Sequence, residues 1–335
     1  MNRQRAKAWA SKAWAVVLAG GEGSRLHGLT RNSEGAAVPK QFCSLQGGPT
    51  LIQESLQRAS SIAPLQRICA VVAAHHRPWW RQMLNYLPEQ NVIVQSHNRG
   101  TAHGMLLPLL QIESQDPDAV VVFMPADHYI SDEETLTGSL RQAAALAAID
   151  RESIYLLGAE PDQPDTELGY IVPGSRSKSE PSPVLRFVEK PTEAGARMLL
   201  EQGALWNVFI VAASVRAFLT LFESSSLAAV MPQTRGRRPP EIDAMHRKLS
   251  SVDFSRDVLQ GNEAMLRVLP VPYCGWTDLG TPPRIATTLQ RLQELRVGPA
   301  PQRSPSGHLN LADQYAWVEQ NPGSEGRFGR VNLHA

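Results

Sequence analysis

Short apolar segments alternate with longer amphipathic ones through the first half of the chain. Five runs rich in aliphatic and β-branched residues predict buried strands, at Trp14–Leu18, Ile68–Ala73, Val92–Val94, Ala119–Met124 and Ile154–Leu157. Between them, Leu51–Ser60, Thr101–Gln115 and Thr135–Ile149 have the length and spacing of amphipathic helices. Strands that alternate with helices in this way predict an α/β fold, a mostly parallel sheet flanked by helices.

The pattern changes from about Leu168. Three further strands are predicted at Tyr170–Val172, Val184–Val188 and Phe209–Ala212, with the polar stretch Gly174–Pro183 between the first two. Because no long helix separates them, we expect a small mixed-sheet subdomain at one end of the parallel sheet. Helices are predicted at Glu241–Leu249 and Thr281–Leu295.

Changes of composition along the chain predict one large domain with a flanking segment at each end. Residues 1–12 form a basic N-terminal tail, residues 13–297 form the domain, and residues 298–335 form a proline-containing extension of uncertain order. The apolar run after the basic tail is short and leads directly into a glycine-rich loop. It therefore predicts a first strand and not a signal peptide.

Composition narrows the classes of partner. The 335 residues carry 33 basic and 32 acidic side chains, a net charge of +1, which argues against a nucleic-acid partner. No apolar run reaches the roughly 18–20 residues that cross a bilayer, so no membrane association is expected. Three scattered cysteines, Cys43, Cys69 and Cys274, argue against a disulfide framework and favour a reducing, cytoplasmic location.

A glycine-rich loop follows the first predicted strand. Gly20, Gly21 and Gly23 would let backbone N–H groups approach phosphate oxygens, and Arg25 is a permanent cation beside them. A dinucleotide fingerprint would need a third small residue where Leu26 stands, which argues against an oxidoreductase, and the Gly-Lys-Ser/Thr of a Walker loop is absent. The loop predicts phosphate binding of another kind.

Two aspartates each follow a predicted strand or apolar run. Asp127 comes after Ala119–Met124, and Asp278 follows the apolar run Val268–Val271. Carboxylate oxygens at the carboxyl ends of parallel strands suit Mg²⁺. The adjacent pair His75-His76 is not expected to bind zinc, because neighbouring side chains at a strand end point apart and no third ligand is close in sequence. His128 receives no role.

Several blocks of the chain resemble the sugar-phosphate nucleotidyltransferases. Gly20–Leu26, Leu29–Arg31 and Pro39–Phe42 are similar to that family's signature. Further similar blocks follow in order at Asn98–Ala102, Met124–His128, Leu168–Ile171, Phe187–Pro191 and Trp276–Gly280. The resemblance covers about residues 14–295 and implies a Rossmann-like fold of the nucleotide-diphospho-sugar transferase type.

The resemblance also implies an enzyme and the roles of its residues. A sugar 1-phosphate would attack the α-phosphorus of a nucleoside triphosphate in line, with Arg25, Lys40 and Lys190 holding phosphates. Asp127 and Asp278 would share one Mg²⁺ ion. The remaining substrate-binding residues would be Gly20, Gly21 and Gly23 for phosphate, Gly100, Thr101 and Ala102 for the base, and Gly169, Glu189 and Asn207 for the sugar.

The substrates implied are GTP and mannose 1-phosphate, giving GDP-mannose and pyrophosphate. Pro39–Phe42 and Asn98–Ala102 are most similar to family members that use this pair. Trp206-Asn207-Val208 departs from the family's pattern, which has small residues after the asparagine. Glucose 1-phosphate with UTP or dTTP therefore stays open, as does a regulatory relative that binds a sugar nucleotide without turnover. A homo-oligomer is compatible with the sequence.

Overall fold

The computed structural model describes residues 9–32, 34–175, 180–229, 231, 241, 250–294, 310 and 311. The predicted tail up to residue 8, the predicted helix at 242–249, and the extension apart from Asn310 and Leu311 lie outside these residues.

Within the described part of the chain, nine strands form one sheet in the order β3-β2-β1-β4-β8-β5-β9-β7-β6. The strands are β1 (Ala13–Ala19), β2 (Ile68–Ala73), β3 (Val92–Gln95), β4 (Val120–Pro125), β5 (Ile154–Ala159), β6 (Gly169–Pro173), β7 (Ser182–Glu189), β8 (Leu205–Ser214) and β9 (Leu266–Val271). Every strand predicted from the sequence is present, with ends that differ by a few residues.

The sheet is mixed, which corrects the prediction of a mostly parallel one. Strands β3, β2, β1 and β4 pair in parallel, as do β5 and β9. Strand β8 runs antiparallel between β4 and β5 and also pairs with β6. Because β7 joins β6 to β9, the strands β8, β5, β9, β7 and β6 close into a ring.

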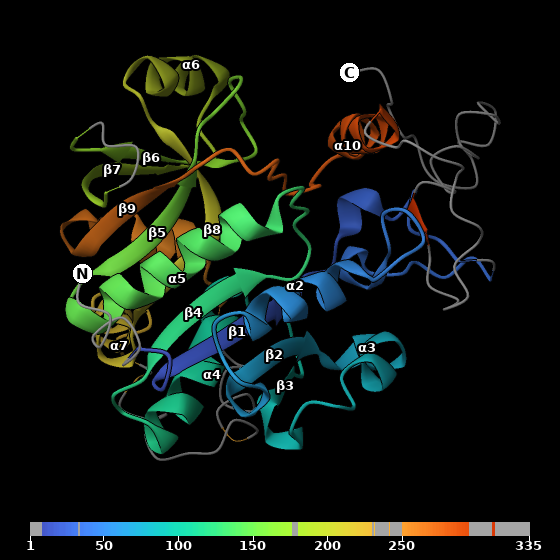
Figure 1. Cartoon of the computed structure of the whole chain (residues 1–335), viewed down its shortest axis with the longest axis horizontal. Coiled ribbons are helices and arrows are strands. Elements are labelled where there is room, and N and C mark those ends of the chain that lie inside the picture. The colour runs from blue at the N-terminus through green and yellow to red at the C-terminus, as the bar shows by residue number, and fades with distance from the viewer. Residues whose placement is uncertain are drawn as a thin grey trace.

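Helices cover both faces of the sheet. They are α2 (Leu51–Ser60), α3 (Arg77–Met83), α4 (Thr101–Gln115), α5 (Glu133–Ile149), α6 (Glu193–Glu201), α7 (Val215–Glu223) and α10 (Pro282–Glu294). Helices α2 and α5 pack on one face, and α4 and α7 on the other, so two hydrophobic clusters form, one on each side (Figure 1). The α/β class is confirmed. Asp132 caps α5 by accepting a hydrogen bond from the Thr135 amide, 3.0 Å long.

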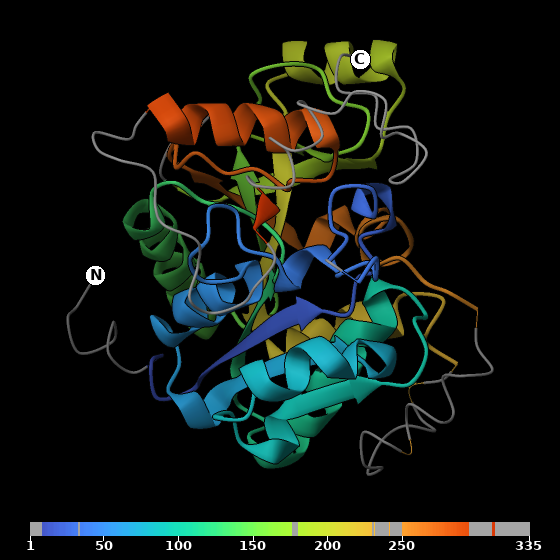
Figure 2. The same ribbon diagram turned by 90° about the vertical axis from the view of Figure 1, so that its right-hand side faces the viewer.

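The predicted mixed-sheet subdomain is one end of the same sheet and does not form a sheet of its own. Helix α6 packs on strands β6 and β7. A third apolar cluster, which includes Tyr170, Leu199 and Trp206, fills the space between the helix and the strands. Both ribbon views place α10 beside the early part of the chain, drawn in blue (Figure 2). The segment that follows β1 and the C-terminal helix α10 therefore lie on the same side of the molecule (Figure 1).

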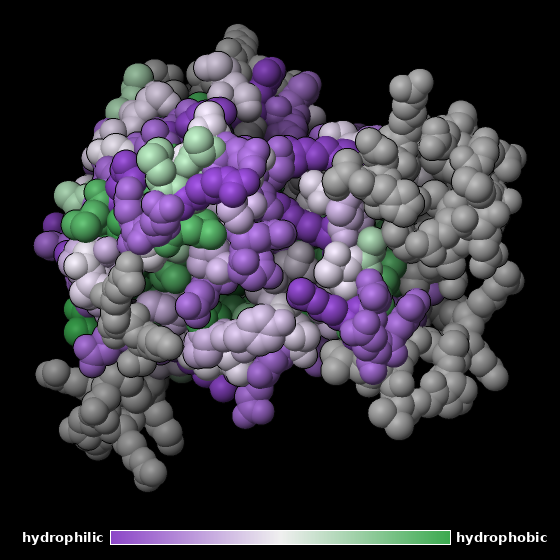
Figure 3. All heavy atoms as spheres, turned by 90° about the horizontal axis from the view of Figure 1, so that it is seen from above, coloured by the Kyte–Doolittle hydropathy of each residue, from purple (hydrophilic) through white to green (hydrophobic). Residues whose placement is uncertain are grey.

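One face of the molecule is largely polar in its described residues (Figure 3). The face in Figure 3 carries mostly hydrophilic side chains, with hydrophobic ones in separate patches. None of the described helices combines the length and apolar character needed to cross a membrane. All three cysteines are free and buried, as the sequence predicts.

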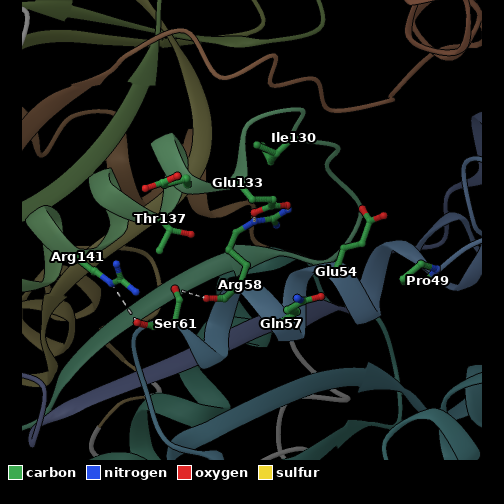
Figure 4. Close-up of a pocket in the computed structure, with 10 residues that line it drawn as sticks. Pro49, Glu54, Gln57, Arg58, Ser61, Ile130, Glu133, Thr137 and Arg141 are labelled. Atoms are coloured by element: carbon green, nitrogen blue, oxygen red, sulfur yellow. Dashed lines mark hydrogen bonds and ion pairs between the residues drawn. The ribbon is translucent and has the colours of Figure 1, made fainter. Parts of the chain in front are cut away.

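A cavity of about 490 Å³ lies between α2 and α5. Arg58 of α2 points across it to Glu133 at the start of α5, with two hydrogen bonds of 2.9 and 2.5 Å (Figure 4). The Arg58 side chain is only 1% exposed, so this pair fixes the two helices to each other. The residues lining this cavity include none of the predicted site residues.

Candidate active site

The glycine-rich loop is held by the segment that contains Lys40. Gly23 has φ of 61°, and a side chain there would bring a Cβ atom within 3.3 Å of the Lys40 amide nitrogen. The Gln41 side-chain nitrogen donates hydrogen bonds to the carbonyls of Ala19 (2.8 Å) and Gly21 (3.0 Å). Gln41 thus shapes the loop, a role that the sequence analysis did not assign.

Lys40 is buried, with 5% of its surface exposed. Its ammonium lies 3.1 Å from Asp127 Oδ2. It also donates to the backbone carbonyls of Asp278 at 2.6 Å and Leu279 at 3.2 Å. The lysine therefore connects the end of β4 to the segment before α10.

A short antiparallel bridge brings the two predicted metal ligands together. The Tyr129 amide donates to the Thr277 carbonyl (2.9 Å), and the Thr277 amide donates to the Tyr129 carbonyl (3.0 Å). Asp127 precedes Tyr129 and Asp278 follows Thr277, so in this antiparallel pairing both lie on the same side of the bridge, and Lys40 binds the Asp127 carboxylate and the Asp278 backbone carbonyl. Two carboxylates beside a loop that is predicted to bind phosphate are the donor set that suits Mg²⁺.

Asp278 has a second cationic neighbour that the sequence analysis missed. Arg284, in the first turn of α10, donates to both Asp278 and Asp165. Burial would raise the pKa of Asp278, but Arg284, followed by His128 and Lys40, holds that pKa below its usual value. The carboxylate is therefore ionised at neutral pH. No motif marks Arg284, because its partners are distant in sequence.

His128 is a neutral neighbour of the two aspartates. Burial lowers its pKa to about 4 despite the nearby carboxylates of Asp127 and Asp278. Its Nδ1 atom accepts a hydrogen bond from the Trp276 indole, 3.1 Å long. The ring therefore carries its proton on Nε2, which lies 4.0 Å from Asp127 Oδ1.

The predicted sugar-binding residues also meet. A Cβ atom at Gly169 would lie 2.6 Å from Glu189 Oε2 and 3.4 Å from the Asn207 Cβ, so a larger residue there would displace the Glu189 carboxylate from its present place. Strand β7 ends at Glu189, and Lys190 takes a left-handed φ of 47°. The chain bends at this position, which frees Lys190 from the alternation of the strand.

The departure from the family pattern in β8 coincides with an irregular backbone. Phe209 has φ of 55°, and its amide donates to the Asn207 side-chain oxygen at 3.1 Å. The pairing of β5 with β8 shifts register at the same level, between Leu156 and Gly158. One atom of the Asn207 amide group therefore stabilises the kink of its own strand.

The predicted base-side segment packs against residues 252–254. A Cβ atom at Gly100 would clash with the Val252 carbonyl oxygen, so this position requires glycine. The Thr101 hydroxyl accepts a hydrogen bond from the Phe254 amide (2.8 Å), and the Ala102 amide donates to the Val252 carbonyl (3.2 Å). Ala102 is fully buried. These contacts give all three residues a structural role at the start of α4.

Arg25 connects the glycine-rich loop to the sugar side. Its guanidinium lies 2.6 Å from Glu167 Oε2, just before β6, and both side chains are about half exposed, at 54% and 41%. The pair therefore joins the glycine-rich loop to the segment that leads into Gly169. An anion that binds at Arg25 would compete with Glu167 for the guanidinium.

The prediction that the side chains of His75 and His76 point apart is wrong. The two residues lie in a 3₁₀ helix, η4 (Ala74–His76), in which adjacent side chains are about 120° apart and not opposed. Both imidazoles approach the carboxylate of Glu22 in the glycine-rich loop. Glu22 is a third side chain of a metal-ligating type beside them, which the spacing in sequence did not reveal.

Comparisons with known proteins agree on one family. The nucleotidyl transferase family matches residues 14–294. Mannose-1-phosphate guanylyltransferase of Escherichia coli (strain K12) is 28% identical over 298 residues, which cover 81% of this chain and 58% of the relative. Mannose-1-phosphate guanylyltransferase ManC of Salmonella typhimurium is 30% identical over 295 residues, with the same two coverages, 81% and 58%.

A solved structure shares the fold and part of the sequence. The Thermus thermophilus crystal structure described as mannose-1-phosphate geranyltransferase has a TM-score of 0.71 and 26% identity, covering 82% of this chain and 79% of that one. The chain spans 58% of the length of the two bacterial relatives above.

The environment of Glu189 predicts a pH-dependent stability. Burial, and then the charge of Asp253, raise its pKa from 4.5 to about 7, although Lys190 and Arg256 oppose the shift. The folded protein therefore binds more protons than the unfolded one between these values, and stability falls as pH rises from 4.5 to 7. Urea unfolding of wild type and Glu189→Gln across this range should show a smaller decrease in the variant. Equal slopes would contradict a buried Glu189 carboxyl.

Proposed function

Because the chain belongs to the nucleotidyl transferase family, we propose that it joins mannose 1-phosphate to GTP, forming GDP-mannose and pyrophosphate. A phosphate oxygen of the sugar 1-phosphate bonds to the α-phosphorus of GTP. The bond from that phosphorus to the bridging oxygen of pyrophosphate breaks, and pyrophosphate leaves with the electron pair. The observation that carries the proposal is the meeting of Lys40, Asp127 and Asp278 beside the glycine-rich loop.

The residues around the glycine-rich loop would hold the charged groups of the triphosphate in place and would not act as a nucleophile. Backbone N–H groups of the loop and the Arg25 guanidinium would hold the triphosphate. Asp127 and Asp278 would hold Mg²⁺, which when bound neutralises charge on the phosphates and the leaving pyrophosphate. Arg284 keeps Asp278 ionised and oriented, and Lys40 keeps it close to Asp127. The protein's own contribution is preorganisation.

The sugar side orients the attacking phosphate. Lys190 is exposed and lies outside the strand, so its ammonium can reach an incoming sugar phosphate. The Glu189 carboxylate lies over Gly169, and it can accept hydrogen bonds from the hydroxyl groups of a sugar. Asn207 lies beside both residues. Holding both reactants in this way replaces a bimolecular encounter by an oriented one.

The names of the bacterial relatives support mannose 1-phosphate and a guanine nucleotide as substrates. For the base, Gly100, Thr101 and Ala102 would contribute mainly by shaping the start of α4, because Thr101 and Ala102 already bind residues 252–254. The irregular strand at Asn207 and Phe209 is the part of the site where sugar selectivity is set.

The experiment that tests the proposal is pyrophosphate release by purified protein with Mg²⁺. Four nucleoside triphosphates are crossed with mannose 1-phosphate and glucose 1-phosphate. Turnover mainly with GTP and mannose 1-phosphate is expected. Turnover with UTP or dTTP and glucose 1-phosphate would keep the reaction and overturn the substrates. Nucleotide binding without turnover of any pair would favour a regulatory protein.

Loss of Asp278 should abolish Mg²⁺-dependent turnover. We expect Asp278→Ala to lower kcat by at least about 100-fold, because one carboxylate cannot organise the cation and its phosphates. Asp118→Ala is the matched control, since Asp118 is 68% exposed and pairs only with surface cations among the contacts described. Circular dichroism checks the fold of both. Near-wild-type kcat in Asp278→Ala would show that the metal assignment is wrong.

Loss of Lys190 should weaken binding of the sugar phosphate. Removing a charge-assisted contact of about 1.5–3 kcal/mol predicts a KM for the sugar 1-phosphate that rises about 10–100-fold, with little change in the KM for the nucleotide. Arg186→Ala, in the strand β7 that precedes Lys190, serves as control, because Arg186 binds Gln202 at the end of α6, 2.7 Å away. An unchanged KM for the sugar phosphate in Lys190→Ala would rule out this role.

A further inference from the structure

Three metal-ligating side chains converge on the outer side of the glycine-rich loop. Glu22 comes from the loop itself, and His75 and His76 come from η4, directly after β2. Among the described residues, this is the one group of three or more histidine, cysteine and acidic side chains whose ligand atoms all lie within 4.8 Å of one another. The aspartates proposed for Mg²⁺ are not part of it.

We propose that Glu22, His75 and His76 form a binding site for Zn²⁺. The Glu22 Oε2 atom lies 3.0 Å from His75 Nε2 and 3.5 Å from His76 Nε2. Ligands at about 2.1 Å from a tetrahedral zinc ion are about 3.4 Å apart, so small movements of the side chains would complete the geometry. One ligand atom from each of the three side chains therefore already lies within 4.8 Å of the other two.

The donor set determines the class of metal. Two imidazoles and one carboxylate are a recognised ligand set for zinc, with the fourth position open to water. Mg²⁺ prefers oxygen ligands and near-octahedral geometry, so the imidazoles disfavour it. Among divalent first-row metals, affinity at sites with nitrogen and oxygen ligands peaks at Cu²⁺, so the tetrahedral His₂Glu ligand set, and not affinity alone, favours Zn²⁺.

The surroundings hold one ligand rigidly and leave an entry path. His76 is 3% exposed, and its ring packs edge-on against Phe42 and Trp79, with centroids 6.0 and 5.9 Å away. His75 and Glu22 are about half exposed, at 54% and 43%. A metal ion can therefore reach the site from solvent while the buried imidazole stays in place.

The effect that bound Zn²⁺ would have on the glycine-rich loop rests on the proposed function. Glu22 lies between Gly21 and Gly23, so its charge is close to where the triphosphate would bind. A bound Zn²⁺ would offset this charge and tie the loop to the end of β2. We expect Zn²⁺ to tighten GTP binding severalfold in wild type, in excess Mg²⁺, and not in His75→Ala, which keeps the carboxylate but loses a ligand.

The direct test is titration of the full chain with Co²⁺, a spectroscopic substitute for Zn²⁺, in millimolar Mg²⁺. We expect one equivalent to bind with the visible absorption of a tetrahedral site, and Zn²⁺ to displace it. Glu22→Gln and His75→Ala should each weaken binding by at least about tenfold. Both residues are half exposed, so these variants should fold, which thermal melting checks.

Two controls keep the outcome unambiguous. His97→Ala removes an exposed histidine outside the group and should bind Co²⁺ as wild type does. The double variant Asp127→Asn, Asp278→Asn should also retain binding. Wild-type affinity in Glu22→Gln and His75→Ala, or loss of binding in the aspartate variant, would overturn the proposal. Turnover plays no part in this titration, so its result is independent of whether the proposed reaction is observed.

Discussion

The burial of the Lys40 ammonium is the constraint on which the site depends. A buried cation must be paired, and this one has the Asp127 carboxylate and two backbone carbonyls around it. These partners come from the end of β4 and from the segment before α10, while Gln41 beside it holds the glycine-rich loop. Three parts of the chain that are distant in sequence are thereby fixed to one point.

Local strain occurs where the proposed chemistry would take place. In the described part of the chain, the non-glycine residues with positive φ are Lys190, Phe209 and Leu279. Lys190 lies next to Glu189, Phe209 binds Asn207, and Leu279 follows Asp278. Such conformations cost about 1–3 kcal/mol each and persist only where the surroundings enforce them. The contacts of Lys40 with Leu279 and of Asn207 with Phe209 provide that enforcement.

Sequence patterns predicted local structure better than long-range pairing. Helices α2 and α4 have the predicted ends, because amphipathic spacing is a local property. The antiparallel insertion of β8 between β4 and β5 was missed, since strand direction depends on partners far along the chain. For the same reason no motif predicted the contact of Arg284 with Asp278. His75 and His76 were misjudged because a strand end was assumed where a 3₁₀ turn begins.

The most direct test of the central constraint is amide hydrogen exchange in wild type and Lys40→Met. The methionine keeps the unbranched apolar stem of the side chain but removes the charged ammonium that joins Asp127 to the carbonyls of Asp278 and Leu279. Faster exchange is expected at the Tyr129 and Thr277 amides, which bond to each other's carbonyls, with no change in the central strands. Unchanged exchange at these two amides would contradict the claim that Lys40 holds the site together.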